Sequence, residues 1–222
     1  PMLDKAPNKK LSDLLDTFGA ALAAGDIDKA IECFQEDCYW RDLVTFTWNL
    51  KTMEGRDQIR AMLESQLSKT KPSHWQIAEG EDAAETDGLI ESWITFETGV
   101  ARGYGHIRVK NGKIWTLLTT MAELKGHEEK AGFTRPLGAK HGHGKGRKSW
   151  KEERDDELAE LGFSKQPYTL IIGGGQGGIA LGARLRQLGV PTIIVEKNAR
   201  AGDSWRKRYK SLCLHDPVWY DH

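Results

Sequence analysis

VARGYGHIRVKNGKIWTLLTTM, residues 100–121, predicts a β-hairpin. Asn111 and Gly112 both tolerate a positive φ angle, which the tightest hairpin turns require. The β-branched and aromatic side chains on either side of this turn favour extended backbone. We therefore expect one strand over Val100–Val109 and a returning strand over Ile114–Met121.

The segments before this hairpin predict further strands. After Pro72, the apolar residues Trp75 and Ile77 alternate with polar ones, and the same period of two returns over residues 90–97. Strand-like residues also run from Cys38 to Leu50. An alternating pattern of this kind is typical of a sheet that buries one face and leaves the other in water.

Three helices are expected ahead of and between these strands, because apolar residues recur there at helical spacing. Ser12 or Asp13 can cap the first helix, Asp26 caps the second, and the third begins after Gly55. This order predicts an α+β cone, in which three helices pack on one face of a curved antiparallel sheet. The predicted cone domain covers residues 10–124.

Residues 125–166 have a different composition and predict a linker. They are rich in Gly, Lys, Arg and His and poor in periodic apolar residues, although the charged residues 151–161 favour a short solvated helix. His141 and His143 have a spacing that could ligate a metal. Two histidines on a glycine-rich loop without a third ligand are more typical of a solvated segment, so no metal site is expected.

Residues 173–178, GGGQGG, fit the dinucleotide-binding pattern G-x-G-x-x-G. A short apolar strand over Thr169–Ile172 precedes the glycines, a helix over Ile179–Leu188 follows them, and Pro191–Val195 predicts a second strand. Glu196 comes directly after that strand, close to the position where this pattern places an acidic residue. The context therefore predicts the first βαβ unit of an α/β domain, which begins at residue 167 and is incomplete at residue 222.

Each of these residues has a physical role in such a site. Gly173 allows the tight turn, Gly175 lets the backbone approach a pyrophosphate, and Gly178 lets the helix lie close to the strand. The Glu196 carboxylate can accept hydrogen bonds from ribose hydroxyls and repels a 2′-phosphate. The site should therefore prefer the adenosine of FAD or NAD over that of NADP.

Residues 168–222 resemble the N-terminal FAD-binding segment of flavin-containing monooxygenases, through three pieces of sequence. These are residues 172–178 with Glu196, residues 202–206 (GDSWR), which are similar to the family's Gly-Gly-x-Trp element, and residues 209–217. Asp203 departs from the second glycine of that element. The resemblance implies that FAD is held by Gly173, Gly175, Gln176, Gly177, Gly178, Glu196, Lys197, Gly202, Ser204, Trp205 and Arg206.

The same resemblance implies an activity. Members of the family use NADPH to reduce FAD, form a flavin hydroperoxide with O₂ and oxygenate a small organic substrate. Their NADPH site and substrate pocket lie downstream of the segment that is matched here. Only two parallel strands are evident, so the 222-residue chain is expected to be a fragment that binds FAD weakly on its own.

Residues 26–34 and 55–63 are similar to the second and third helices of the nuclear-transport-factor-2-like superfamily. Members of this superfamily hold a pocket between helices and sheet, and some use an Asp–His or Asp–Tyr pair for acid–base catalysis. Here such a pair would join Asp42 to His106, unless Asp42 merely ends a strand and His106 faces solvent. The other candidates for such a pocket are Tyr39, His74 and the side chains Trp40, Trp48, Trp93 and Trp115, which could equally fill the core.

The composition limits the classes of function. Lys and Arg total 32 and Asp and Glu total 32, and this balance argues against binding to nucleic acid or to a membrane surface. No apolar run approaches the ~18 residues of a membrane span. Cys33, Cys38 and Cys213 match no zinc or redox spacing and predict reduced thiols in a cytoplasmic protein.

The leading functional prediction is thus an FAD-dependent, NADPH-using monooxygenase, with O₂ and a small molecule as its substrates. One alternative is a non-catalytic cone domain that serves oligomerisation, for example as a homodimer, or binds a small ligand. A further alternative is an isomerase or hydratase centred on Asp42.

Overall fold

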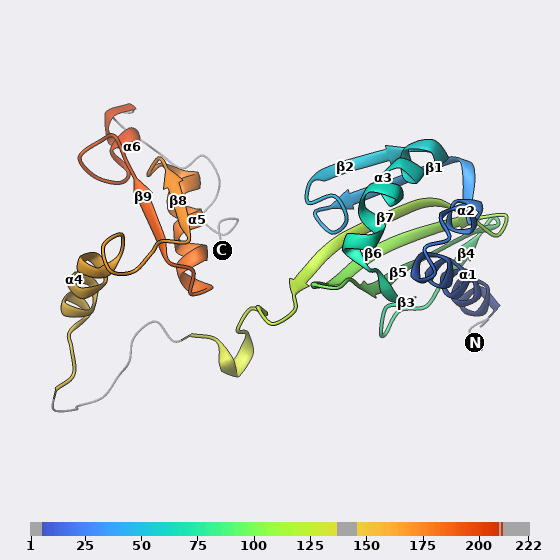
Figure 1. Cartoon of the computed structure of the whole chain (residues 1–222), viewed down its shortest axis with the longest axis horizontal. Helices are drawn as coiled ribbons and strands as arrows, with labels where there is room; N and C mark the ends of the chain where they lie inside the picture. Colours follow the sequence, from blue (N-terminus) through green and yellow to red (C-terminus); the bar gives the residue numbers. More distant parts are fainter. Residues whose placement is uncertain (1–5, 137–145, 209, 211–222) are drawn as a thin grey trace. The chain divides into compact units, whose positions relative to one another are not determined.

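The structure is a computed structural model that describes residues 6–136, 146–208 and 210. The chain divides into two compact units, Pro1–Glu128 and Glu129–His222, which are described separately below (Figure 1). The predicted histidine pair, Cys213 and the similar stretch 209–217 apart from Lys210 lie outside the described residues.

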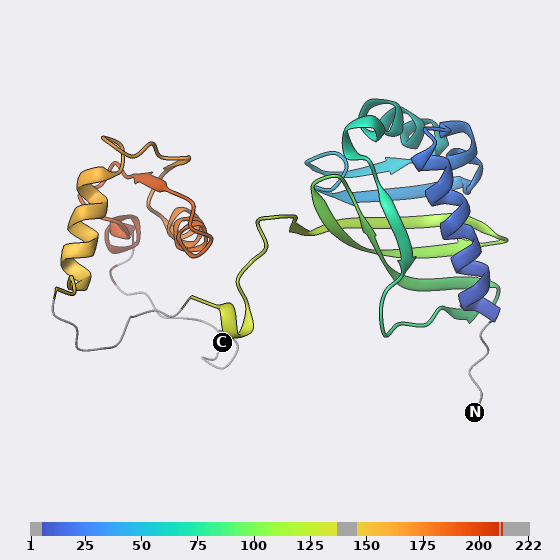
Figure 2. The same ribbon diagram turned by 60° about the horizontal axis from the view of Figure 1, so that its bottom comes forward.

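The first unit is an α+β fold with a curved, seven-stranded sheet, as predicted. The strands follow the order β2-β1-β7-β6-β5-β3, and β4 pairs with β5. Helix α1 packs against β3 and α3 packs against β1 and β2, and Figure 2 shows α1 crossing the strands. The elements are α1 (Ala6–Ala23), α2 (Ile27–Glu32), β1 (Phe34–Leu43), β2 (Leu50–Glu54), α3 (Gly55–Thr70), β3 (Ser73–Ile77), β4 (Ala84–Thr86), β5 (Leu89–Glu97), β6 (Ala101–Lys110) and β7 (Lys113–Leu124).

Several local predictions are confirmed in this unit. Strands β6 and β7 form the predicted antiparallel hairpin, and its turn residues Asn111 and Gly112 have φ angles of 48° and 72°. Asp26 caps α2, because its side chain accepts a hydrogen bond of 3.1 Å from the Lys29 N–H. Helix α3 begins at Gly55, within one residue of the start that the sequence predicts after Gly55.

Two predictions about this unit are wrong. Helix α1 begins at Ala6, so Ser12 and Asp13 lie inside it and do not cap it; Pro7 fits the first turn, where its missing N–H is not needed. The sheet is also not purely antiparallel, because β1 pairs in parallel with β7. The chain between these two strands includes α3, and parallel neighbours need a long connection of this kind.

The interior of the cone is filled by aromatic side chains. Their ring centroids lie between 4.5 and 6.5 Å apart. Gly103 makes room for one of them, since a Cβ at this position would lie 2.2 Å from Cζ of Phe96. The rings belong to Phe18, Phe34, Trp40, Phe46, Trp75 and Phe96.

The second unit contains the strand, helix and strand that are predicted around the glycine motif. Strands β8 (Thr169–Ile172) and β9 (Thr192–Val195) pair in parallel, and α5 (Gln176–Gln187) connects them. The predicted solvated helix is present as α4 (Trp150–Glu160), which starts with a capping box and is exposed throughout. The short helices η1 (Gly132–Thr134) and α6 (Asp203–Arg208) complete the described elements of this unit.

The membrane prediction concerns helices of both units. None of the described helices combines the length and the apolar character that are needed to span a bilayer.

Candidate functional site

The glycine motif forms a tight loop between β8 and α5. Gly173 has a φ angle of 106°, and its N–H donates a 2.7 Å hydrogen bond to the Val195 carbonyl at the end of β9. A Cβ at Gly178 would lie 1.9 Å from the Gly173 carbonyl oxygen, so only glycine fits there. Glycine at position 178 therefore allows α5 to pack close to β8, because any larger residue there would push the helix away from the strand.

The N-terminus of α5 presents main-chain N–H groups. Gly175 is its N-cap residue and makes no side-chain capping bond, and the first turn contains Gln176 and Gly177 but no acidic residue. A Cβ at Gly177 would have no heavy atom within 4 Å, so the space beside this turn is open. Arg184 and Arg186 occupy the last turn, at the opposite end of the helix dipole. This end of α5 therefore suits a bound anion.

Glu196 closes onto the glycine loop from β9. Its Oε1 accepts hydrogen bonds from the Asn198 N–H at 2.8 Å and from Asn198 Nδ2 at 2.6 Å, and its Oε2 accepts one from the Gly174 N–H at 2.6 Å. The main-chain hydrogen bonds from Asn198 and Gly174 hold the pKa of the Glu196 carboxyl below its usual range, and the neighbouring charge of Lys197 adds to this. Glu196 is thus ionised at neutral pH.

The Gly202–Arg206 element begins beside the same loop. The Gly202 N–H donates a 3.2 Å hydrogen bond to the Gly174 carbonyl, and Ser204 Oγ lies 3.9 Å from the position of a Cβ at Gly175. Arg206 behaves differently, because its Nη1 donates to Asp203 Oδ1 at 2.8 Å and to the Ala201 carbonyl at 3.0 Å. The guanidinium group is therefore turned back onto its own element.

Asp203 takes the place of the second glycine that the resemblance led us to expect. It is buried, and its Oδ1 accepts hydrogen bonds from Arg200 Nε at 3.0 Å and from Arg206 Nη1. These two ion pairs, which a glycine could not form, connect the loop before α6 to the helix itself.

The structure thus brings most of the predicted cofactor residues together, while Lys197 and Trp205 are exposed and Arg206 is engaged elsewhere. Two further residues contact the site without having been predicted. Asn198 contacts Glu196, and Lys207 contacts Asn198. Their only sequence signal is that Asn198 follows Glu196 by two residues at a strand end. The predicted residues around the loop are Gly173, Gly175, Gln176, Gly177, Gly178, Glu196, Gly202 and Ser204.

The candidates for acid–base catalysis in the cone do not form a site. Asp42 is fully buried, and its Oδ2 accepts hydrogen bonds from the Phe46 N–H at 2.9 Å, the Thr47 N–H at 2.8 Å and Thr47 Oγ1 at 2.8 Å. Its Oδ1 accepts from Thr119 Oγ1 at 2.7 Å, and that hydroxyl in turn accepts from Trp40 Nε1 at 2.9 Å. These contacts use the carboxylate to fold the β1–β2 loop onto β7.

The candidate pairing of Asp42 with His106, one of the two alternatives that the sequence left open, is not formed. His106 lies opposite Leu118 in the sheet, whereas Asp42 bonds to Thr119, the next residue along β7. Because successive side chains of a strand point to opposite faces, the two groups lie on opposite sides of the sheet. His106 packs edge-on against Trp93, with ring centroids 4.8 Å apart, and burial lowers its pKa.

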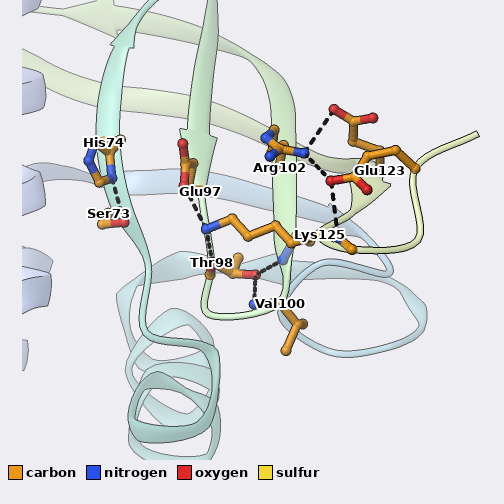
Figure 3. A network of polar contacts seen from close by, with 11 residues as sticks. Ser73, His74, Glu97, Thr98, Val100, Arg102, Glu123 and Lys125 are labelled. Carbon is orange, nitrogen blue, oxygen red and sulfur yellow. Dashed lines mark hydrogen bonds and ion pairs between the residues drawn. The ribbon is translucent and has the colours of Figure 1, made fainter.

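His74 and Tyr39 lie away from Asp42 as well. His74 is exposed, and its Nδ1 is 2.8 Å from Ser73 Oγ at the end of the sheet that Figure 3 shows. In the same view Lys125 Nζ contacts Glu97 Oε2 at 2.6 Å. The pKa of Tyr39 is raised, mainly because its hydroxyl donates a hydrogen bond to the Asp37 carboxylate.

The four predicted pocket tryptophans also separate. Trp40 is buried in the core, Trp48 is 63% exposed on the β1–β2 loop, and Trp93 stacks on Tyr104 at 5.2 Å on the outer face of the sheet. Trp115 is not part of the aromatic core either and is flanked by two basic side chains. The guanidinium carbon of Arg108 lies 4.7 Å from a ring centroid of Trp115, and Lys110 Nζ lies 3.3 Å from one.

Two open grooves of the first unit are lined by described residues outside the group of core aromatic rings. One has a volume of about 360 Å³ and lies between β2 and α3, with Met53 and Met62 among its lining residues. The other has a volume of about 550 Å³ and is lined by residues such as Leu22, Ile27 and Leu67, from α1, α2 and α3. Neither groove is lined by Asp42, by His106 or by the core aromatic side chains.

Comparison with known proteins identifies the first unit. The SnoaL-like domain family matches residues 15–117, so the first unit is a SnoaL-like, NTF2-like domain. The chain is also similar to solved structures, at low identity and with TM-scores below 0.5. The orange carotenoid protein of Anabaena (Nostoc) sp. PCC 7120, which binds canthaxanthin, is 16% identical with a TM-score of 0.40, over 50% of this chain and 36% of that one. An NTF2-like protein of unknown function from Cytophaga hutchinsonii is 17% identical with a TM-score of 0.34. The similarity covers 49% of this chain and 87% of that one.

A different set of relatives connects the chain to oxidoreductases. An uncharacterized CzcO-like oxidoreductase of Geobacillus kaustophilus is 47% identical over 52 residues, and the uncharacterized oxidoreductase CzcO of Bacillus subtilis is 46% identical over 52 residues. Each match covers 23% of this chain and spans 15% of the length of the relative.

Proposed function

We propose that the second unit holds the adenosine diphosphate half of FAD, and that the chain serves an FAD-dependent, NADPH-using monooxygenase. The observation that carries this proposal is the glycine loop, which Glu196 closes beside the N-terminus of α5. The similarity to uncharacterized oxidoreductases supports the general reaction class. O₂ and a small organic molecule would be the substrates, and the buried thiols Cys33 and Cys38 are consistent with the predicted cytoplasmic location.

The residues around the loop fit this cofactor. The first turn of α5 would bind the pyrophosphate through main-chain N–H groups, in the open space beside Gly177. The ionised Glu196 carboxylate would accept a hydrogen bond from a ribose hydroxyl. FAD, when bound, supplies the redox and oxygen-activating chemistry, while these residues bind and orient it.

Titration of FAD into the 222-residue chain tests the proposal, with flavin absorbance at ~450 nm and fluorescence as readouts. We expect weak, saturable binding that Glu196→Gln reduces. Glu153→Gln is the matched control, because it makes the same change on the exposed helix α4. Absence of saturable binding by the wild-type chain, or equal binding by Glu196→Gln, would contradict the proposal.

A second role, self-association of the cone domain, is favoured by the outer face of its sheet. Trp93 and Tyr104 are both partly exposed there and stack with an interplanar angle of 7°. Exposed aromatic groups of this kind are enriched at protein interfaces. Light scattering after size exclusion should find a dimer that Trp93→Ser weakens and Trp48→Ser, a change at another exposed tryptophan, does not. A monomer at all concentrations would rule this role out.

A further inference from the structure

A chain of hydrogen bonds connects α6 to the glycine loop through the side chain of Glu196. Lys207 Nζ donates to Asn198 Oδ1 at 2.8 Å, and Asn198 Nδ2 donates to Glu196 Oε1 at 2.6 Å. Glu196 Oε2 then accepts from the Gly174 N–H at 2.6 Å. Glu196 and Asn198 are half-buried, whereas Lys207 is exposed. Lys207 and Asn198 therefore hold the carboxylate from the side that faces away from the glycine loop.

This arrangement leaves the two carboxylate oxygens unequal. Each oxygen of an ionised carboxylate can accept about two hydrogen bonds. Oε1 already accepts two, from the main-chain and side-chain nitrogens of Asn198, while Oε2 accepts one from Gly174. The remaining acceptor capacity is therefore on Oε2, beside the loop. A glutamate carboxylate otherwise rotates easily about its last torsion, so some group has to hold this orientation.

We propose that Asn198, supported by Lys207, is a positioning residue that orients Glu196 so that the adenosine ribose site accepts a free 2′-hydroxyl and rejects a 2′-phosphate. This inference rests on the proposed function, since it concerns the same adenosine diphosphate site. With Oε2 fixed beside the loop, a ribose hydroxyl can donate a hydrogen bond to it. A 2′-phosphate would be repelled by the negative charge of the same carboxylate, which cannot rotate out of the site. The selectivity belongs to the network and not to Glu196 alone.

NMR titration of the 222-residue chain with ADP-ribose and with 2′-phospho-ADP-ribose measures this selectivity as a ratio of two dissociation constants. We expect the wild-type chain to favour ADP-ribose by about tenfold or more, and Asn198→Ala to lose most of that ratio, as expected for a lost hydrogen bond to a charged group. A merely structural change would weaken both ligands equally and leave the ratio unchanged.

Two variants of Lys207 test whether its hydrogen bond to Asn198 matters separately from its positive charge. Lys207→Gln and Lys207→Met both remove the positive charge, but only glutamine keeps a donor for Asn198 Oδ1. We expect Lys207→Gln to retain the wild-type ratio and Lys207→Met to lose it in part. Because Lys207 is exposed, this pair also decides the question if Asn198→Ala does not fold.

The outcomes separate the two proposals. A wild-type ratio that persists in Asn198→Ala and in Lys207→Met would overturn the positioning role and leave the FAD site in place. A wild-type chain that binds neither ADP-ribose nor FAD would contradict the proposed function itself, and the positioning role with it.

Discussion

The two units of this chain bury their apolar residues to very different extents. In the cone domain the ring of Phe96 is only 1% exposed and stacks on Trp75 at 4.5 Å. In the second unit Leu170 of β8 is 59% exposed and Ile172 is 86% exposed. Parallel strands are normally buried on both faces, and the described residues cover β8 and β9 only in part. The cone is therefore held by its core, whereas the second unit depends on the close contacts of its glycine loop.

The largest expected effect comes from removing a ring of the cone core. Phe96→Ala should lower the free energy of unfolding by about 3–5 kcal/mol, because it leaves a cavity among the packed aromatic rings. Ile172→Ala, a change at an exposed apolar residue of the second unit, should cost less than about 1 kcal/mol. Urea unfolding followed by tryptophan fluorescence checks both, and equal costs would remove the contrast between the units.

The buried carboxylate of Asp42 should have the next largest effect. Asp42→Asn replaces one of the two accepting oxygens with an amide nitrogen that cannot accept, so either Thr119 Oγ1 or the donors on the other oxygen, such as the Thr47 N–H, lose their partner. We expect a loss of about 2–4 kcal/mol of stability by urea unfolding. Unchanged stability would mean that Asp42 is not the structural support of the β1–β2 loop and would reopen a catalytic role.

Two neighbouring glycines test the loop of the second unit. Gly178→Ala places a Cβ against the Gly173 carbonyl and should cost about 1–3 kcal/mol, whereas Gly177→Ala enters open space and should be neutral or slightly stabilising. Hydrogen exchange of the Ile171 and Val195 amides reports the opening of this unit. Similar protection in both variants would show that α5 does not pack as closely on β8 as described.

The smallest expected effect is electrostatic and depends on pH. A hydrogen bond from Arg102 is the main cause that lowers the pKa of Glu128 from 4.5 to about 2. A lowered folded-state pKa means that this contact stabilises the cone fully above about pH 4.5 and that the contribution is lost as the pH falls towards 2. The difference in melting temperature between wild type and Glu128→Gln should therefore shrink over this range. A difference that is independent of pH would contradict this assignment.

The sequence predicted features that depend on neighbouring residues, and it did not predict features that depend on residues far apart in the chain. The Asn111–Gly112 turn, the Asp26 cap and the start of α3 at Gly55 are local, and all three are confirmed. The parallel pairing of β1 with β7 is not local, because it joins residues such as Trp40 and Leu117 that no short pattern relates. The sequence left the role of Asp42 open for the same reason, since its partner Thr119 comes from that distant strand.

The amino-acid sequence alone specified the local elements of both units and the glycine motif with Glu196, because turn, cap and close-packing requirements depend on neighbouring residues. Only the tertiary structure decided which polar groups meet. It joined Asp42 to Thr119 across the sheet, and it placed Lys207 and Asn198 behind Glu196. The physical reason is that a hydrogen bond depends on the position and direction of both partners, and the folded backbone sets these for residues on different elements.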